Sequence, residues 1–143
     1  MAVAARVSIV TLGVSDLARS TKFYQALGWE LAPSSSPAIS FFRTAGGVLA
    51  LFPFDELAKD ARLPANRARG FGGVTIAINV EQPEMVQPAL DEAERAGATI
   101  LKPATKADWG GVSGYFADPD GYAWEIAWGP NSVFKSDGSL DVG

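Results

Sequence analysis

Histidine and cysteine are both absent from the chain. Without histidine, the sequence lacks the side chain that most often acts as an acid or base near neutral pH and that is the commonest ligand of transition metals. Without cysteine, it has no disulfide, no thiolate metal site and no cysteine nucleophile, which is typical of a reducing compartment. These absences exclude the usual side chains of many catalytic and metal centres.

Clusters of positive charge and long apolar runs are missing too. The 12 lysine and arginine residues are scattered and the formal net charge is -4, which argues against the basic surface that nucleic-acid binding needs. No stretch approaches about 18 consecutive apolar residues, the length that indicates a membrane span. The N-terminal MAVAARVSIV does not resemble a signal peptide. We therefore expect a cytoplasmic protein that binds neither nucleic acid nor a membrane.

The first part of the sequence predicts the order strand, helix and three strands. Residues 7–14 alternate between apolar and smaller side chains, which is typical of a strand. Ser15 and Asp16 offer a helix N-cap, and the helical apolar spacing after them stops at Gly28. A short strand at residues 29–31 and two strands within SFFRTAGGVLALF, joined by a glycine turn, complete a βαβββ module over residues 5–54.

The same pattern restarts after a polar segment. Residues 55–70 are polar and contain a proline, which predicts a linker with one helical turn. Over residues 71–129 the order repeats: a strand in VTIAINV, a helix opened by Pro83, a strand in ATIL, a loop over residues 102–111, and the strands SGYFAD and YAWEIAW around a DPDG turn. Residues 130–143 remain as a C-terminal tail.

Repetition of the module has a consequence for the fold class. One module alone would expose an apolar sheet face, whereas two modules side by side can bury it. We predict a single α+β domain over residues 1–143, in which two tandem βαβββ modules form a curved half-barrel sheet around a central cavity.

Two segments of the chain resemble a known family. VTLGVSDLARSTKFYQALGWEL and GYFADPDGYAWEIAW are similar to the opening strand and helix and to the final strand pair of the vicinal oxygen chelate superfamily, which includes glyoxalases, bleomycin resistance proteins and dioxygenases. The resemblance covers residues 7–128 and implies the two-module fold. It also implies a homodimer, in some members with modules exchanged between subunits. Metal-using members carry ligands that face the cavity on the first and last strands of each module.

The matching positions in this chain are poor in metal ligands. They are Ile9 and Ala50 in the first module and Thr75 and Glu125 in the second. One carboxylate and one hydroxyl do not supply the three or four ligands that Zn, Fe or Mn sites ordinarily have. We expect no metal and no cofactor, and a glyoxalase-like or dioxygenase-like metal enzyme is the least favoured hypothesis.

The cavity side of the predicted strands is mostly small and apolar, with a few polar groups. Phe41 and Arg43 share this face if Arg43 pairs with Val48, whereas a slip of one residue would turn both outward. Tyr115 suits the orientation of a ligand, and Trp109 in the loop ADWGG suits stacking on a flat ligand at the pocket mouth. The candidate ligand-binding residues are Ile9, Phe41, Arg43, Ala50, Phe52, Thr75, Trp109, Tyr115 and Glu125. Trp124 and Trp128 fall on the opposite side, where helix packing is expected.

Glu125 is the candidate catalytic residue. A carboxylate surrounded by Ala, Ile and Phe would lose water, and it could then transfer a proton or bind a cationic ligand. A structural carboxylate held by Arg43 or Tyr115 fits the same position. Two functions stay open. One is metal-independent binding of a small molecule, such as sequestration of an antibiotic or another planar or cationic compound. The alternative is a metal-independent isomerase or lyase that uses Glu125 as acid or base.

Overall fold

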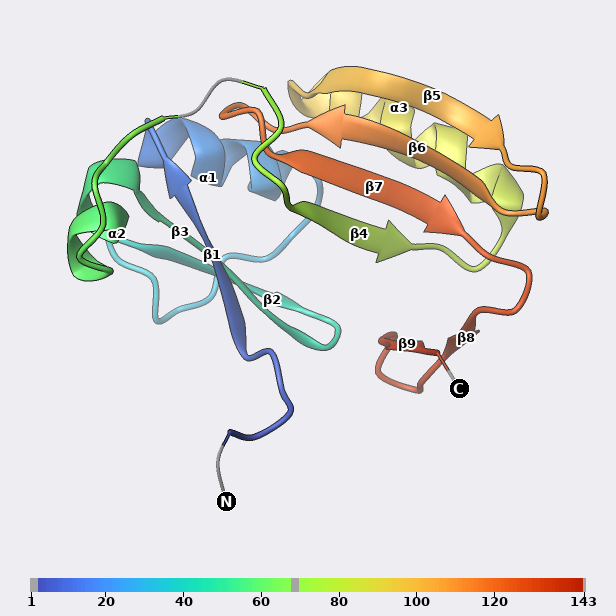
Figure 1. The fold of residues 1–143 in the computed structure, drawn as a ribbon, viewed down its shortest axis with the longest axis horizontal. Coiled ribbons are helices and arrows are strands. Elements are labelled where there is room, and N and C mark those ends of the chain that lie inside the picture. Colours follow the sequence, from blue (N-terminus) through green and yellow to red (C-terminus); the bar gives the residue numbers. More distant parts are fainter. Residues whose placement is uncertain (1–2, 68–69, 143) are drawn as a thin grey trace.

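The computed structural model describes residues 3–67 and 70–142. The first module lies on the left of Figure 1. Its first helix begins as predicted, because the side chain of Asp16 accepts a 3.0 Å hydrogen bond from the backbone N–H of Arg19. The elements of this half are β1 (Ile9–Val14), α1 (Leu17–Ala26), β2 (Ser40–Thr44), β3 (Gly47–Pro53) and α2 (Phe54–Asp60).

The second module lies on the right of Figure 1 and repeats this order. Its helix ends at Gly97, which adopts the left-handed backbone conformation (φ 116°) that glycine tolerates best. The elements are β4 (Thr75–Asn79), the 3₁₀ turn η1 (Pro83–Met85), α3 (Val86–Ala96), β5 (Thr99–Lys106), β6 (Val112–Ala117) and β7 (Ala123–Trp128). The tail then forms a small hairpin from β8 (Val133–Phe134) and β9 (Leu140–Asp141).

The two modules form separate sheets with matching strand orders, β1-β3-β2 and β4-β7-β6-β5. In each sheet the first strand runs parallel to the last strand of its module, and the remaining neighbours are antiparallel. The strand predicted at residues 29–31 is reduced to one bridge between Leu31 and Phe42. The predicted α+β fold of two βαβββ modules is confirmed, and its sheets curve without closing into a barrel.

Two further segments differ from the sequence prediction. Helix α2 follows β3 directly and has 7 residues, so it is longer than the single turn expected in the linker 55–70. Residues 68–69 of that linker lie outside the described residues. None of the helices in the described ranges is long and apolar enough to cross a bilayer.

Strand β5 extends into the segment predicted as a loop over residues 102–111. It contains Pro103, which a central strand would not tolerate because proline has no N–H to donate. The strand is at the edge of its sheet, and its pairing with β6 is irregular between Lys102 and Thr105. Proline fits this irregular edge, which is why the strand continues past it.

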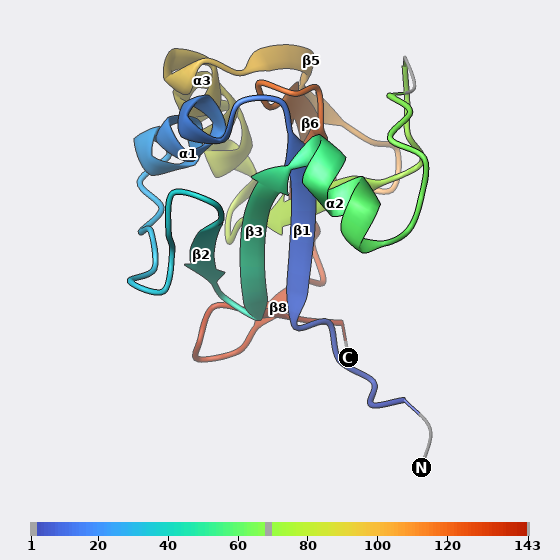
Figure 2. The same ribbon diagram turned by 90° about the vertical axis from the view of Figure 1, so that its left-hand side faces the viewer.

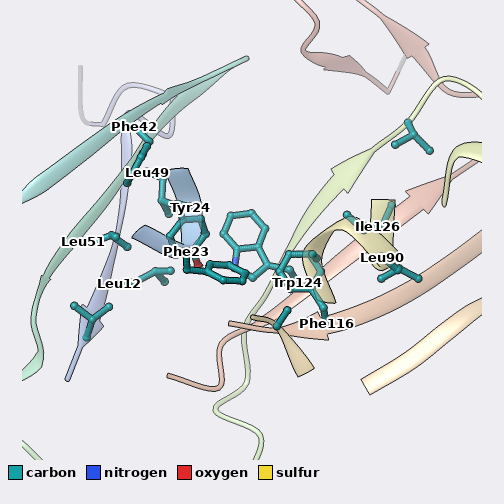
Figure 3. Packing of buried hydrophobic residues seen from close by; sticks show 14 of the residues in the cluster. Leu12, Phe23, Tyr24, Phe42, Leu49, Leu51, Leu90, Phe116, Trp124 and Ile126 are labelled. Carbon is teal, nitrogen blue, oxygen red and sulfur yellow. The ribbon is translucent and has the colours of Figure 1, made fainter. Parts of the chain in front are cut away.

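One apolar core lies between the two sheets (Figure 3). Helix α1 is inserted there, since the ring of Phe23 lies 6.2 Å from that of Phe116 and the ring of Tyr24 lies 5.9 Å from that of Trp124. Figure 2 shows α1 beside α3, above β1, β2 and β3. The sheet faces predicted to pack on helices therefore do so, and both face the same core.

Candidate ligand-binding site

The candidate residues of the first module share one face of their sheet. Arg43 pairs with Val48, and Phe41 pairs with Ala50, so the register that places Phe41 and Arg43 beside Ile9 is the one present. This face is opposite to the one that carries Leu12 and the rest of the core. It therefore points away from the shared core.

The exposure of these side chains varies along the face. Ala50 on the central strand β3 is buried, Phe41 and Phe52 are half-buried, and Ile9 is 51% exposed. Helix α2 packs on one end of this face, because a Cβ added to Gly13 would lie 3.0 Å from the Phe54 ring. The other end, around Ile9, is open to solvent.

The candidate residues of the second module form a row across its outward face. Lys102 pairs with Tyr115, Tyr115 with Glu125, and Glu125 with Ala77. Burial raises the pKa of the Tyr115 phenol, and the negative charge of Glu125 together with their side-chain interaction raises it further. Glu125 is half-buried, so it is less enclosed than the sequence suggested. Thr75 lies on the same face and is exposed.

Within one chain these two sets of residues are not brought together. Their sheets present the core faces to each other, so the faces that carry Arg43 and Glu125 point in different directions. Trp109 does not join either set. It is 72% exposed, and its ring lies over Gly111, where an added Cβ would overlap the ring carbons.

A cleft of about 710 Å³ opens between the two modules and includes the segment that follows α1. Of the candidate residues only Arg43 lines it, and the further polar side chains of its lining are those of Ser8, Glu30, Thr44, Asn79 and Ser139. The C-terminal hairpin contributes Phe134 and Leu140. The apolar floor consists of Val10, Leu49, Ile76, Ile78, Trp29 and Trp124.

The aromatic part of this floor is held in place by the core. The rings of Trp29 and Trp124 meet edge to face, with centroids 5.6 Å apart. The indole N–H of Trp124 donates a 3.0 Å hydrogen bond to the Tyr24 hydroxyl. Because this N–H already has a partner, Trp124 presents carbon surface to the cleft. A flat apolar molecule fits such a floor.

Sequence reasoning assigned Trp124 to packing against a helix, and its side chain is buried in the core, but that reasoning missed that Trp124 and Trp29 also border a cavity. The alternation of apolar and polar residues along a strand indicates that one sheet face is buried, but it does not indicate where the elements that pack on that face end. The tail hairpin was missed as well, because β8 and β9 have only 2 residues each. The sequence does contain a signal for the turn of this hairpin, because Asp137 and Gly138 form a turn-favouring pair between segments that contain apolar residues.

Comparison with known proteins supports the resemblance. Residues 6–126 match the family model described as the Glyoxalase/Bleomycin resistance protein/Dioxygenase superfamily. A search of curated proteins gave no match. Among solved structures, a glyoxalase-related enzyme from Fulvimarina pelagi is 34% identical with a TM-score of 0.87, and the alignment covers 98% of this chain and 99% of that chain.

More distant structures share the fold alone. A glyoxalase/bleomycin resistance protein/dioxygenase family enzyme from Burkholderia phytofirmans PsJN is 21% identical with a TM-score of 0.77, covering 87% of this chain and 98% of that chain. Lactoylglutathione lyase from Agrobacterium tumefaciens is 22% identical with a TM-score of 0.67, covering 88% of this chain and 95% of that chain.

Proposed function

Because this chain belongs to the Glyoxalase/Bleomycin resistance protein/Dioxygenase superfamily, we propose that it uses the two-module fold to bind a small molecule, and that it does so without a metal ion. The binding site is the cleft between the modules. The observation that carries the proposal is a volume of about 710 Å³ above an apolar floor that includes Trp29 and Trp124. Pockets for small molecules commonly have roughly 300–1,000 Å³ and a mainly apolar lining.

The metal-free part of the proposal rests on donor chemistry. The four positions that the family resemblance assigns to ligands hold Ile9, Ala50, Thr75 and Glu125. Two of these have no donor atom in their side chains, and the other two supply a hydroxyl and a carboxylate. In the described ranges no three His, Cys, Asp or Glu side chains gather in a way that could hold a metal ion. These residues do not fit a transition-metal centre.

Ligand binding can be tested with intrinsic tryptophan fluorescence. We expect saturable quenching by one or more members of a panel of planar antibiotics, aromatic acids and 2-oxo compounds, because Trp29 and Trp124 line the cleft. The response should survive chelator treatment and should persist in Trp109→Phe, since Trp109 is exposed away from the cleft. Quenching that appears only with an added divalent metal would overturn the metal-free proposal.

An isomerase or lyase remains a second candidate, and the row of Lys102, Tyr115 and Glu125 favours it. The raised pKa of Tyr115 keeps its phenol protonated at neutral pH, so it can donate to a developing negative charge while Glu125 takes a proton. Turnover that is lost in Glu125→Gln, with ligand affinity retained, would support the enzyme. Stoichiometric binding without product would support sequestration.

The proposed function also includes the cellular compartment in which the protein acts. A chain without cysteine suits a reducing compartment, and we place its action in the cytoplasm. Antibiotic sequestration would then act on a compound that has already entered the cell.

A further inference from the structure

Among the arginines that the structure describes, Arg43 is the one that lines the cleft. Its side chain is exposed near the end of β2, where the strand borders the cleft. By contrast, the guanidinium of Arg19 donates to Ser15 Oγ and to the Pro119 carbonyl, and that of Arg67 lies 3.7 Å from an oxygen of Asp120. Within residues 3–67 and 70–142, the Arg43 guanidinium has neither a hydrogen bond nor an ion pair. Its donors are therefore available to a ligand.

A second polar side chain lies across the cleft. Asn79 ends β4, lines the cleft and is half-buried. Its amide makes no hydrogen bond to another side chain or to the backbone within the described ranges. Arg43 belongs to the first sheet and Asn79 to the second, so each module places one unpaired polar side chain at the rim of the cleft.

Apart from the Ser8 hydroxyl and the Glu30 carboxylate, the other polar side chains of the lining are already bonded. The floor is apolar, and the indole N–H of Trp124 is already bonded to Tyr24. The hydroxyl of Thr44 donates to the Gly47 carbonyl, and that of Ser139 donates to Asp137. A ligand's polar group therefore gains most at the rim, where Arg43 and Asn79 are free to donate.

We propose that the ligand of this cleft is a flat apolar molecule with one anionic group, which Arg43 binds at the rim with help from Asn79. The inference rests on the proposed binding function and adds the charge of the ligand. A guanidinium presents paired donors that match a carboxylate or a similar anion. Glu30 is the acidic side chain that lines the described cleft, so a second anionic group near it would be repelled.

This assignment differs from the cationic ligand that the sequence favoured. That expectation depended on Glu125, which lies on the outward face of the second sheet and does not line the cleft. The unpaired charged side chain that the first sheet places at the cleft is that of Arg43, and its charge is positive. Because the proposed site is the cleft beside Arg43 and not the sheet face that carries Glu125, the expected charge of the ligand is negative.

The test compares three probes with the same ring system: 2-naphthoate, 2-naphthalenemethanol and 2-naphthylmethylammonium. We expect calorimetry to give an affinity for naphthoate about tenfold above that for the alcohol, the lower end of what a charge-assisted hydrogen bond supplies, with the ammonium weakest. Arg43→Gln should remove the preference, and Arg43→Lys should keep only part of it because the paired donors are lost. Arg95→Gln, on α3 away from the cleft, removes the same charge and should change nothing.

The binding site of the probe is located by nuclear magnetic resonance, from the indole N–H signals of the 4 tryptophans. Naphthoate should shift those of Trp29 and Trp124 and leave that of Trp109 in place. Equal affinity for all three probes, with the same indole shifts, would overturn the charge assignment and leave the binding proposal standing. No binding of any probe would overturn both.

Discussion

The hydroxyl of Tyr24 donates a 2.6 Å hydrogen bond to Oδ2 of Asp118, which lies 94 residues later in the chain. The hydroxyl oxygen of Tyr24 also accepts the indole N–H of Trp124, and Oδ1 of Asp118 accepts the backbone N–H groups of Asp120 and Tyr122. The three side chains are buried. The contact connects α1 of the first module to the β6–β7 turn of the second, and it fixes the tryptophan that floors the cleft.

Replacing Tyr24 by phenylalanine tests this connection. We expect the free energy of unfolding to fall by about 1–3 kcal/mol, because the change leaves a buried carboxylate oxygen and a buried indole N–H without partners. Denaturant titration measures it. Tyr122→Phe is the matched control, since it removes one partly buried hydrogen bond to the neutral Gly13 carbonyl. A loss no larger than that of the control would contradict a special role for the Tyr24 contact.

Much of this fold follows from local patterns in the sequence. Alternation in β1 separates Leu12, which is in the core, from Ile9, which is half exposed, and the observed register keeps that separation. Asp16 starts a helix, as its side chain predicts, and Gly97 ends one because glycine tolerates the left-handed backbone conformation there. These features depend on backbone preference and on the period of the apolar residues, which a single sequence displays.

The packing of the two modules against each other could not be predicted from these local patterns. Alternation tells which face is buried, and leaves open whether another sheet, a helix or a second chain covers it. Here α1 inserts Phe23 and Tyr24 between the sheets, which turns the Arg43 and Glu125 faces apart. The cleft depends on this packing and on the position of the tail hairpin, so its residues could be named only from the structure.

The stability of the protein should respond to the protonation of Asp118. Burial raises the pKa of Asp118 above its ordinary value of 3.8, although hydrogen bonds from Tyr24, Tyr122 and Asp120 lower it in part. The folded state therefore binds the proton more tightly than the unfolded state does. This contribution to stability is present at low pH and is lost as the pH rises through the folded-state pKa.

Denaturant titrations of the wild type and Asp118→Asn across a pH series can detect this term. We expect the unfolding free energy of the wild type, relative to that of the variant, to decline as the pH rises from 3.8 toward neutrality. A relative stability that increases over the same range would mean that the hydrogen bonds to Asp118 outweigh its burial.

Gly114 on β6 occupies a position that no larger side chain fits. An added Cβ would lie 2.4 Å from a methyl carbon of Leu90 and 2.8 Å from the backbone oxygen of Lys102. We expect Gly114→Ala to lower the free energy of unfolding by roughly 1–3 kcal/mol, the usual cost of overpacking a core. Gly72→Ala, with open space around it, should leave the stability nearly unchanged. Equal effects of the two substitutions would argue against close packing of α3 on β6.

We propose that two copies of the chain associate as a homodimer. Strands β1 and β4 are at the edges of their sheets, and the outward faces beside them expose Val7, Ile9 and Val74 to 72%, 51% and 71%. Exposed edges with apolar neighbours favour pairing with another chain. Light scattering at micromolar concentration should give twice the monomer mass, and Ile9→Lys should shift the population toward the monomer. A monomeric mass for the unmodified chain would contradict the proposal.

The C-terminal hairpin should determine how tightly the cleft holds a ligand. Its turn meets the β2–β3 turn of the first module, since a Cβ added to Gly138 would lie 3.4 Å from that of Ala45 and one added to Gly46 would lie 3.3 Å from that of Ser139. The hairpin follows the second module in the chain (Figure 1), and its contact with the first module places it across the cleft that both modules line. Phe134 lines the cleft there and is half-buried.

We therefore expect Phe134→Ala to weaken the binding of 2-naphthoate about tenfold, in line with the loss of a buried aromatic contact of roughly 1.4 kcal/mol or more. Val133→Ala is the control, because Val133 is 60% exposed and does not line the cleft. Calorimetry gives the affinities, and denaturant titration checks that both variants remain equally stable. Direct contact with the ligand requires a larger effect of the Phe134 substitution than of the Val133 substitution. Equal weakening of binding by the two substitutions would contradict that contact.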